Sequence, residues 1–122
     1  MAVSIAPTYG MHRHLYTITI TADGDADVVL PDKAISNIAF ESDGVDGGGT
    51  LTVLGTVNGT TFTALGFNTS ADPRNATSVA NATAAGLWVL SQDLLGIRGV
   101  RFHLTGATTP TLVLTLAVSF VQ

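Results

Sequence analysis

The stretch that decides the fold is residues 51–66, LTVLGTVNGTTFTALG, in which apolar and polar residues alternate on both sides of Asn58-Gly59. Alternation with a period of two is typical of a strand with one buried face. Asn-Gly is the strongest short signal for a two-residue hairpin turn, because both central residues need a positive φ. The stretch therefore predicts a β-hairpin.

A two-residue turn at this point sets the register of the hairpin. It pairs Val57 with Thr60 and Gly55 with Phe62, so that the Phe62 ring packs over Gly55 in the core. The same register pairs two further core positions, Val53 with Ala64 and Leu51 with Gly66. The reverse face then carries Thr52, Leu54 and Thr63, which makes it polar but uncharged.

Strand patterns recur along the chain. They fall at residues 15–21, 27–30, 35–42, 87–91, 97–105 and 111–120. Together with the hairpin they make about eight strands, and no segment has a convincing helical period. We predict an all-β fold, a two-sheet antiparallel β-sandwich of the jelly-roll type. The first 14 residues lack alternation and are expected to form an extended N-terminal arm, and residues 15–122 a single sandwich domain.

The last strand shows the pattern most clearly. In TLVLTLAVSF, residues 111–120, one face carries leucine, valine and phenylalanine only. The other face carries Val113, Thr115 and Ala117, which again gives a surface without charge. Residues 68–86 form a long polar connection, and such a segment in a small domain is normally functional or ordered by a neighbour.

The order of these elements is similar to that of galactose-binding-like jelly rolls. In that family a hairpin turn with an aromatic residue shortly after it precedes a penultimate strand with arginine before an apolar residue. The corresponding residues here are Asn58, Gly59, Phe62, Arg101 and Phe102. The resemblance covers about residues 50–121 and implies a two-sheet jelly roll.

Composition narrows the function. Charged residues make up 11% of the chain and hydrophobic residues 46%, against roughly 25% charged in an average soluble domain. The net charge of -4 and the scattered cations argue against nucleic acid as a partner. No stretch approaches the roughly 18 apolar residues of a membrane span, and the N-terminus does not read as a signal peptide. We expect synthesis in a cytoplasm and no membrane partner.

No catalytic constellation stands out, and we expect no enzymatic activity and no cofactor. The chain has no cysteine and no serine in a G-x-S-x-G setting. His12 and His14 have a spacing compatible with metal ligation, and His103 could join them only through folding. The alternative is that all three are ordinary polar residues.

Alternating acidic residues raise the question of calcium. Asp23, Asp25 and Asp27 begin like an EF-hand loop, but Val28 stands at the sixth position of that loop in place of glycine. A looser site that adds Asp43 and Asp46 stays open, beside the alternative of a solvated turn.

Uncharged sheet faces are typical of a subunit that is permanently covered by neighbours, because a soluble monomer relies on charge. With its short length, sandwich pattern, N-terminal arm and long loop, the chain resembles the small jelly-roll capsid decoration (cement) proteins of tailed bacteriophages. The resemblance implies a non-enzymatic virion protein that binds major capsid protein or other virion proteins and forms homo-oligomers. The alternatives are a phage tail or baseplate component and a carbohydrate-binding jelly-roll module.

The predicted contact residues lie on the N-terminal arm, the long loop and the two uncharged faces. They are Tyr9, His12, Arg13, His14, Thr52, Leu54, Thr63, Arg74, Val79, Val113, Thr115 and Ala117.

Overall fold

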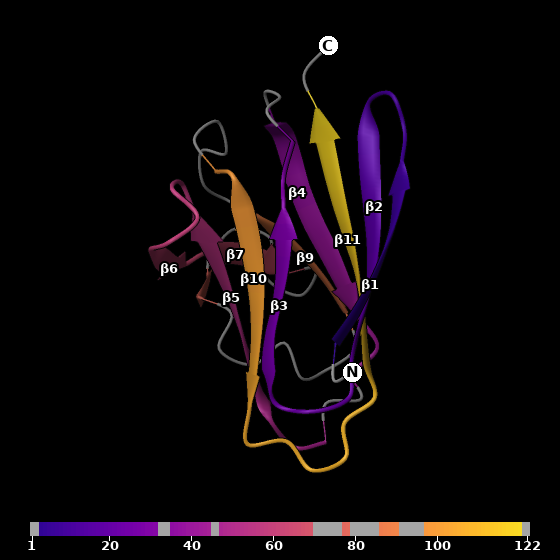
Figure 1. The fold of residues 1–122 in the computed structure, drawn as a ribbon, viewed down its shortest axis with the longest axis vertical. Coiled ribbons are helices and arrows are strands. Elements are labelled where there is room, and N and C mark those ends of the chain that lie inside the picture. The colour runs from indigo at the N-terminus through magenta and orange to yellow at the C-terminus, as the bar shows by residue number, and fades with distance from the viewer. Residues whose placement is uncertain are drawn as a thin grey trace.

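Eleven β-strands form two antiparallel sheets that pack face to face in the computed structural model (Figure 1). The structure describes residues 3–31, 35–44, 47–69, 77–78, 86–90 and 97–120. No helix occurs among these residues, and so none that could cross a membrane. The predicted all-β sandwich is confirmed.

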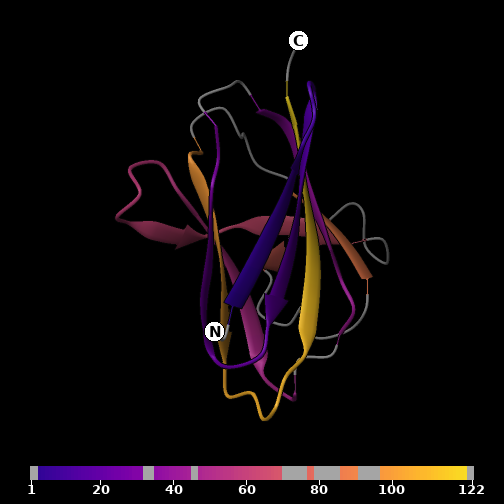
Figure 2. The ribbon, with the colours of Figure 1, turned by 45° about the vertical axis from the view of Figure 1, so that its right-hand side comes forward.

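The two sheets differ in width. The large sheet has seven strands in the order β1 (Val3–Tyr9), β2 (Arg13–Ile20), β11 (Leu112–Phe120), β4 (Ile35–Ser42), β9 (Gly86–Leu90), β7 (Gly66–Thr69) and β8 (Thr77–Ser78). The small sheet has four strands in the order β3 (Gly24–Val29), β10 (Gly99–Thr105), β5 (Thr50–Thr56) and β6 (Phe62–Ala64). Figure 2 shows the small sheet on the left and the strands β1, β2 and β11 of the large sheet on the right.

Eight of these strands follow the jelly-roll order. The chain alternates between the sheets from β2 to β5 and again from β9 to β11, so that the sheets read β2-β11-β4-β9 and β3-β10-β5-β6. Two interleaved Greek keys produce this order. β1 extends the large sheet at one edge, and β7 and β8 extend it at the other.

The core lies between the facing rows of the two sheets. Alternate residues of β11 from Leu112 to Phe120 are buried, as the period of two predicts. Phe40 of β4 and Phe102 of β10 meet across the core, with ring centroids 5.3 Å apart and planes at 79°. This edge-to-face geometry is a favoured one for aromatic pairs, and it joins one sheet to the other.

The predicted hairpin exists, but the predicted register and turn type are wrong. β5 and β6 pair Thr56 with Phe62 and Gly55 with Thr63, a shift of one residue. The cause is the Asn58 side chain, whose Oδ1 accepts hydrogen bonds from the amides of Thr60 and Thr61, both at 2.8 Å. Because these amides are satisfied locally, the connection is a wider loop than the predicted type I′ turn.

Leu65, and not Phe62, packs over Gly55. The chain leaves the small sheet after Ala64 and enters the large sheet at Gly66, and Leu65 is buried at this crossing. A Cβ atom on Gly55 would lie 2.8 Å from Leu65 Cδ2. The predicted contact between Phe62 and Gly55 is therefore wrong, and so is the pairing of Leu51 with Gly66, because these two residues belong to different sheets.

Residues 3–9 are extended and pair along their whole length with β2. The expected boundary between residues 14 and 15 falls inside β2, so the arm is continuous with the sandwich. The long connection at 68–86 also contains strand residues, because β7 ends at Thr69 and β8 lies within it. The rest of that connection lies outside the described residues.

Gly55→Val should destabilise the protein, because the added side chain collides with Leu65 at the end of the core. Overpacking of this kind typically costs about 1 to 3 kcal/mol. Urea unfolding measures the loss, with Thr52→Val, which changes a half-buried outward position of the same strand, as the control. A Gly55→Val protein as stable as the control would contradict the contact.

Candidate assembly surfaces

Over β1, β2, β11 and β4, the strands of the large sheet whose side chains the structure describes, the outer face carries few charges. Its central row runs from Thr17 of β2 through Thr115 of β11 to Glu41 of β4, and all three residues are exposed. The outward residues of β1, β2, β11 and β4 are otherwise small or uncharged, apart from Arg13: Ser4, Ala6, Thr8, Leu15, Thr19, Val113, Ala117, Ser119, Asn37 and Ala39. We call this set of residues the threonine face.

A shallow hollow of about 150 Å³ lies on the threonine face. Leu15, Ala39 and Ala117 form its apolar lining, and the two charged residues of the face, Arg13 and Glu41, also line it. The hollow is too small for a drug-sized ligand, because such sites usually measure about 300 to 1,000 Å³.

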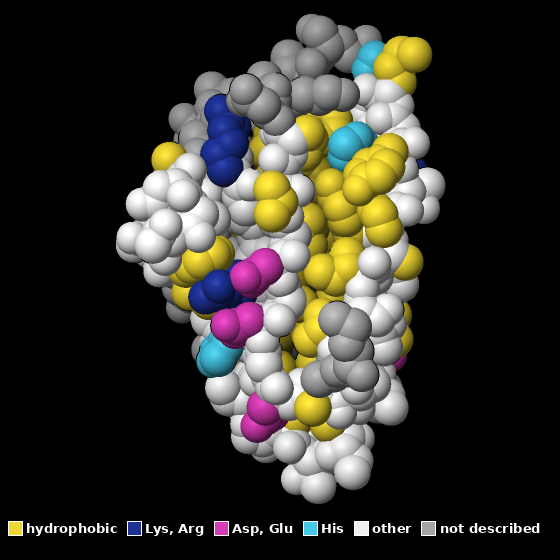
Figure 3. All heavy atoms as spheres, in the orientation of Figure 1, with side chains coloured by type: hydrophobic (Ala, Val, Ile, Leu, Met, Phe, Trp, Pro, Cys, Tyr) yellow, Lys and Arg dark blue, Asp and Glu magenta, His cyan; other side chains and the backbone are white. Residues whose placement is uncertain are grey.

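The outer face of the small sheet is charged, which the sequence analysis did not predict. Arg101 of β10 reaches Asp27 of β3 through two hydrogen bonds, Nε to Oδ1 at 2.6 Å and Nη2 to Oδ2 at 2.9 Å. Asp25 lies 3.6 Å from Arg101 Nη1 and also contacts His103 Nδ1. The hydrogen bond to Asp27 raises the pKa of Arg101, and the charges of Asp27 and Asp25 raise it further. In Figure 3 these groups lie together over β3 and β10.

Phe62 belongs to the same charged face. The Arg101 guanidinium carbon lies 3.7 Å from the centre of the Phe62 ring, a cation–π contact. Next to it is an open groove of about 250 Å³ with Val29 and Val57 on its walls and Gly99 in its lining. Because Arg101 covers the ring, Phe62 is not an open aromatic platform for stacking a sugar.

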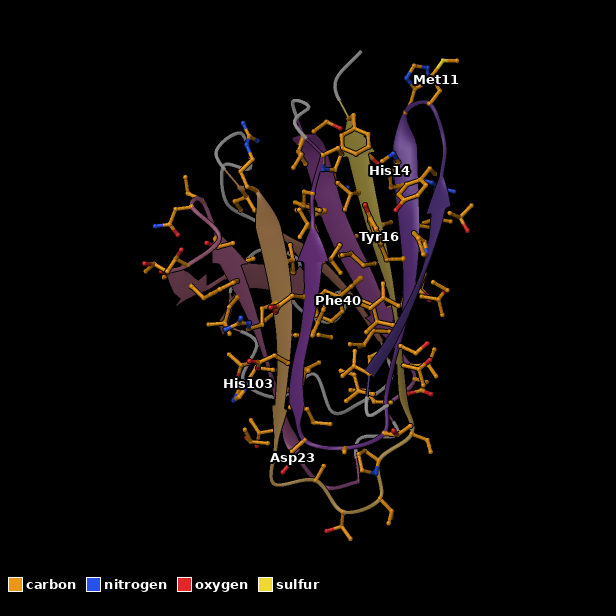
Figure 4. The ribbon with its side chains drawn as sticks, in the orientation of Figure 1. Met11, His14, Tyr16, Asp23, Phe40 and His103 are labelled. Carbon is orange, nitrogen blue, oxygen red and sulfur yellow. The ribbon has the colours of Figure 1, made fainter. Side chains whose placement is uncertain are left out.

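An aromatic cluster closes one end of the sandwich near the β1–β2 turn. The His14 ring meets Tyr9 at 4.7 Å and Phe120 at 4.8 Å between centroids, both edge to face. His14 Nδ1 lies 3.2 Å from the Tyr16 hydroxyl. Burial raises the pKa of the Tyr16 phenol above its ordinary value, and the neighbouring Tyr9 raises it further. Figure 4 shows His14 and Tyr16 below the turn that carries Met11.

The structure does not bring the three histidines together. His12 is exposed at the β1–β2 turn, His14 is buried in the aromatic cluster, and His103 pairs with Asp25 on the small sheet. Figure 4 shows His103 and His14 far apart, toward opposite ends of the molecule. In the described part of the chain no group of three potential ligands could hold a metal ion.

The acidic residues considered for calcium that the structure describes each have a structural partner. Asp23 accepts hydrogen bonds from the amides of Gly106 and Ala107, at 3.0 and 2.9 Å, and so caps the loop before β11. Asp43 accepts one from the amide of Val113 at 3.2 Å. Asp46 lies outside the described residues. Each described carboxylate of this group is thus held by a hydrogen bond or an ion pair within the protein.

The predicted contact residues divide among several surfaces. Val113, Thr115, Ala117 and Arg13 lie on the threonine face, and Tyr9 and His12 lie at the β1–β2 turn. Thr52 and Leu54 lie on the charged face, opposite His103 and Arg101, and Thr63 is exposed on β6. His14 is 8% exposed and presents little surface. Arg74 and Val79 lie outside the described residues.

Two features escaped sequence reasoning. The ion pairs could not be predicted without knowing that β3 and β10 are neighbours in the small sheet. The apolar residues of β1, including Ile5 and Tyr9, share the inward face of that strand but are 36% and 67% exposed. Alternating hydrophobicity is hidden there because alanine and proline interrupt it.

No family profile and no curated protein sequence matches the chain. A match among solved structures is the crystal structure of SPBc2 prophage-derived protein YomS, with a TM-score of 0.60. The two chains share one fold. The superposition covers 93% of this chain and 99% of the prophage-derived protein, and the sequences are 13% identical.

The ion pair on the charged face should contribute modestly to stability and lose its effect in salt. Asp27→Asn and Arg101→Met should each lower the melting temperature by less than Gly55→Val does, since exposed pairs are weak and screened. The double variant should lose less than the sum of the two single losses. A coupling that does not decrease between low and high salt would contradict an electrostatic origin.

Alkaline unfolding should report on Tyr16. Because its folded pKa is raised, the stability that its neutral form contributes is complete below about pH 10 and is lost as the pH rises through the folded pKa. Between pH 9 and roughly pH 11, the free energy of unfolding of Tyr16→Phe should therefore fall less than that of the wild type. Chemical unfolding across this range measures the difference, and parallel profiles would contradict it.

Proposed function

We propose that the chain is a non-enzymatic structural protein of a phage virion, which decorates or cements the capsid by binding capsid subunits and copies of itself. The observation that carries the proposal is the threonine face. On β1, β2, β11 and β4, the charged side chains among its described outward residues are Arg13 and Glu41. Both border the same hollow.

The physical argument is one of solvation. A monomeric protein keeps an exposed sheet soluble with interspersed charges, whereas a charge enclosed in an interface without a partner costs several kcal/mol. Threonine keeps the preference for strand structure and avoids that cost. A face built from Thr17, Thr115 and their small neighbours therefore suits a lasting contact with another protein.

The fold supports a phage context. A prophage-derived protein shares it over nearly the full length of both chains. The two chains are 13% identical, so the likeness is one of fold, and the role in a virion is our proposal.

The polar groups of the charged face support a binding role over catalysis. Asp25, Asp27, Arg101 and His103 are held in mutual pairs, so the described residues of this face offer no nucleophile with a base beside it. A carbohydrate-binding module is less well supported, because the Phe62 ring lies under Arg101. A tail or baseplate component would use the same threonine face, and the experiment below separates it from a capsid protein.

Thr115→Lys should spare the fold and weaken binding to the virion. Thr115 is exposed in the isolated chain, so the lysine is solvated there, but in an interface its charge would be trapped. A cost of several kcal/mol lowers affinity by about a hundredfold or more. The control is Thr50→Lys, which places the same charge at an exposed position of the small sheet.

Binding is measured by co-sedimentation with separated capsids and tails of the encoding phage. Wild type and Thr50→Lys should sediment with capsids, and Thr115→Lys should not. Sedimentation with tails alone would favour the tail alternative over capsid decoration. Binding to neither particle, or capsid binding by Thr115→Lys at wild-type strength, would contradict the proposal.

A further inference from the structure

β1 is an edge strand, and its hydrogen-bonding pattern shows which of its backbone groups face outward. The amide of Gly10 donates to the carbonyl of Arg13 at 2.9 Å, which makes this pair a hydrogen-bonded one. In an antiparallel ladder, hydrogen-bonded and non-hydrogen-bonded pairs alternate. The backbone amides and carbonyls of Thr8, Ala6 and Ser4 therefore hydrogen-bond to the residues of β2 with which they pair.

The intervening residues of β1 then direct their backbone groups to the open edge: Val3, Ile5, Pro7 and Tyr9. Among the described residues no strand pairs with this edge. Pro7 has no amide hydrogen, and its position costs the sheet nothing because its nitrogen faces away from β2. The edge thus offers the amides of Val3, Ile5 and Tyr9 and four carbonyl groups of this strand.

The side chains of the same residues form an apolar row without a cover. They lie on the core side of the large sheet, opposite Ile20, Ile18, Tyr16 and His14 of β2. Val3 still packs against the core and β3 of the small sheet approaches β1, yet Ile5 is 36% and Tyr9 67% exposed. Figure 3 shows apolar side chains gathered on this side of the molecule.

Most edge strands of soluble proteins are protected from pairing by charged side chains or by a covering segment. Val3–Tyr9, VSIAPTY, contains no charged residue. This matters for one partner above all, a second copy of the chain, because a twofold axis brings the residues near it close to their own equivalents, and a charge there close to a like charge. Pro7 limits the possible registers without closing the edge, since the proline removes a single donor.

We propose that β1 pairs antiparallel with β1 of a second copy of this chain, about a twofold axis at Ile5. In this register the amide of Ile5 donates to the carbonyl of Ile5 of the partner subunit, and the reverse. The amide of Val3 donates to the carbonyl of the partner's Pro7. Over residues 3–7, the missing donor of Pro7 therefore leaves the Val3 carbonyl of each copy without a bond.

The pairing also covers the apolar row. The large sheets of the two copies become one continuous sheet. On its core side, the exposed side of Ile5 meets its equivalent and that of Pro7 meets the partner's Val3. The inference deepens the self-association part of the proposed function. It is independent of capsid binding, because the threonine face lies on the opposite side of the large sheet and the dimer is tested without any particle.

The first test is the mass of the protein in solution by light scattering. Wild type and Thr50→Lys should be dimers at micromolar concentration. Ile5→Lys should be a monomer, with at least tenfold weaker association, because the axis would bring two ammonium groups together. A monomeric wild type, or an Ile5→Lys dimer as stable as the wild type, would overturn the proposal.

A cross-linking test does not depend on the lysine variant. The chain has no cysteine, so a single introduced cysteine forms a disulfide only between copies. Cα atoms of a hydrogen-bonded antiparallel pair lie about 5.5 Å apart, within the range for a disulfide. Ile5→Cys should therefore cross-link rapidly under mild oxidation. Ser4→Cys, which this register places opposite the partner's Ala6, is the matched control, and equal cross-linking of the two would overturn the register.

Amide exchange distinguishes strand pairing from any other dimer or bound segment. Ser4 and Ala6 should be protected in both wild type and Ile5→Lys, since they bond to β2, which also confirms that the variant is folded. Val3 should be protected in the wild-type dimer alone. Fast exchange of Val3 in a wild-type dimer would mean that the copies associate through another surface, and the proposal would fall.

Discussion

The contact between Phe40 and Phe102 is the interaction on which the sandwich depends. The two rings come from the large and the small sheet and meet edge to face with their centroids 5.3 Å apart. Both are essentially inaccessible to solvent, and the buried rows of β11, β2 and β5 surround them. An aromatic pair adds about 0.5 to 1.5 kcal/mol beyond its buried area, and here it also sets which faces of the two sheets oppose each other. Because successive side chains of a strand point to opposite faces, the inward rows also determine which residues face outward.

The unequal widths of the sheets explain why the surfaces differ. Four strands oppose a seven-stranded sheet, and β1 at its edge keeps the apolar residues Ile5 and Tyr9 partly exposed although β3 approaches it. The small sheet faces solvent on its outer side and bears the ion pairs of Arg101, as an ordinary soluble surface does. The large sheet bears the threonine face. One molecule thus presents a solvated side and a side that is suited to being covered.

Sequence periodicity was sufficient for most strands and for the buried row of β11, because each depends on residues close in the chain, but it missed β1. It failed at Leu65 and Phe62, where the Asn58 side chain and the crossing between sheets shift the register by one residue. A side chain that binds two nearby amides leaves no trace in an apolar pattern. The pairing of Arg101 with Asp27 also required the topology, since the two residues are far apart in the sequence. The uncharged outer face of β11 needed only alternation, whereas its extension across β1 and β4 needed the strand order.

The position of β11 has a consequence for how the protein is made. This strand lies between β2 and β4 in the middle of the large sheet, yet it is the last strand of the chain. On the ribosome, β2 and β4 are synthesised well before the strand that must separate them, and most native contacts join residues distant in sequence. Folds dominated by such contacts form slowly, and their unpaired strands are open to wrong partners in the meantime. The sandwich can therefore close only after residue 120 has left the ribosomal tunnel, and until then β2 and β4 lack the strand that lies between them.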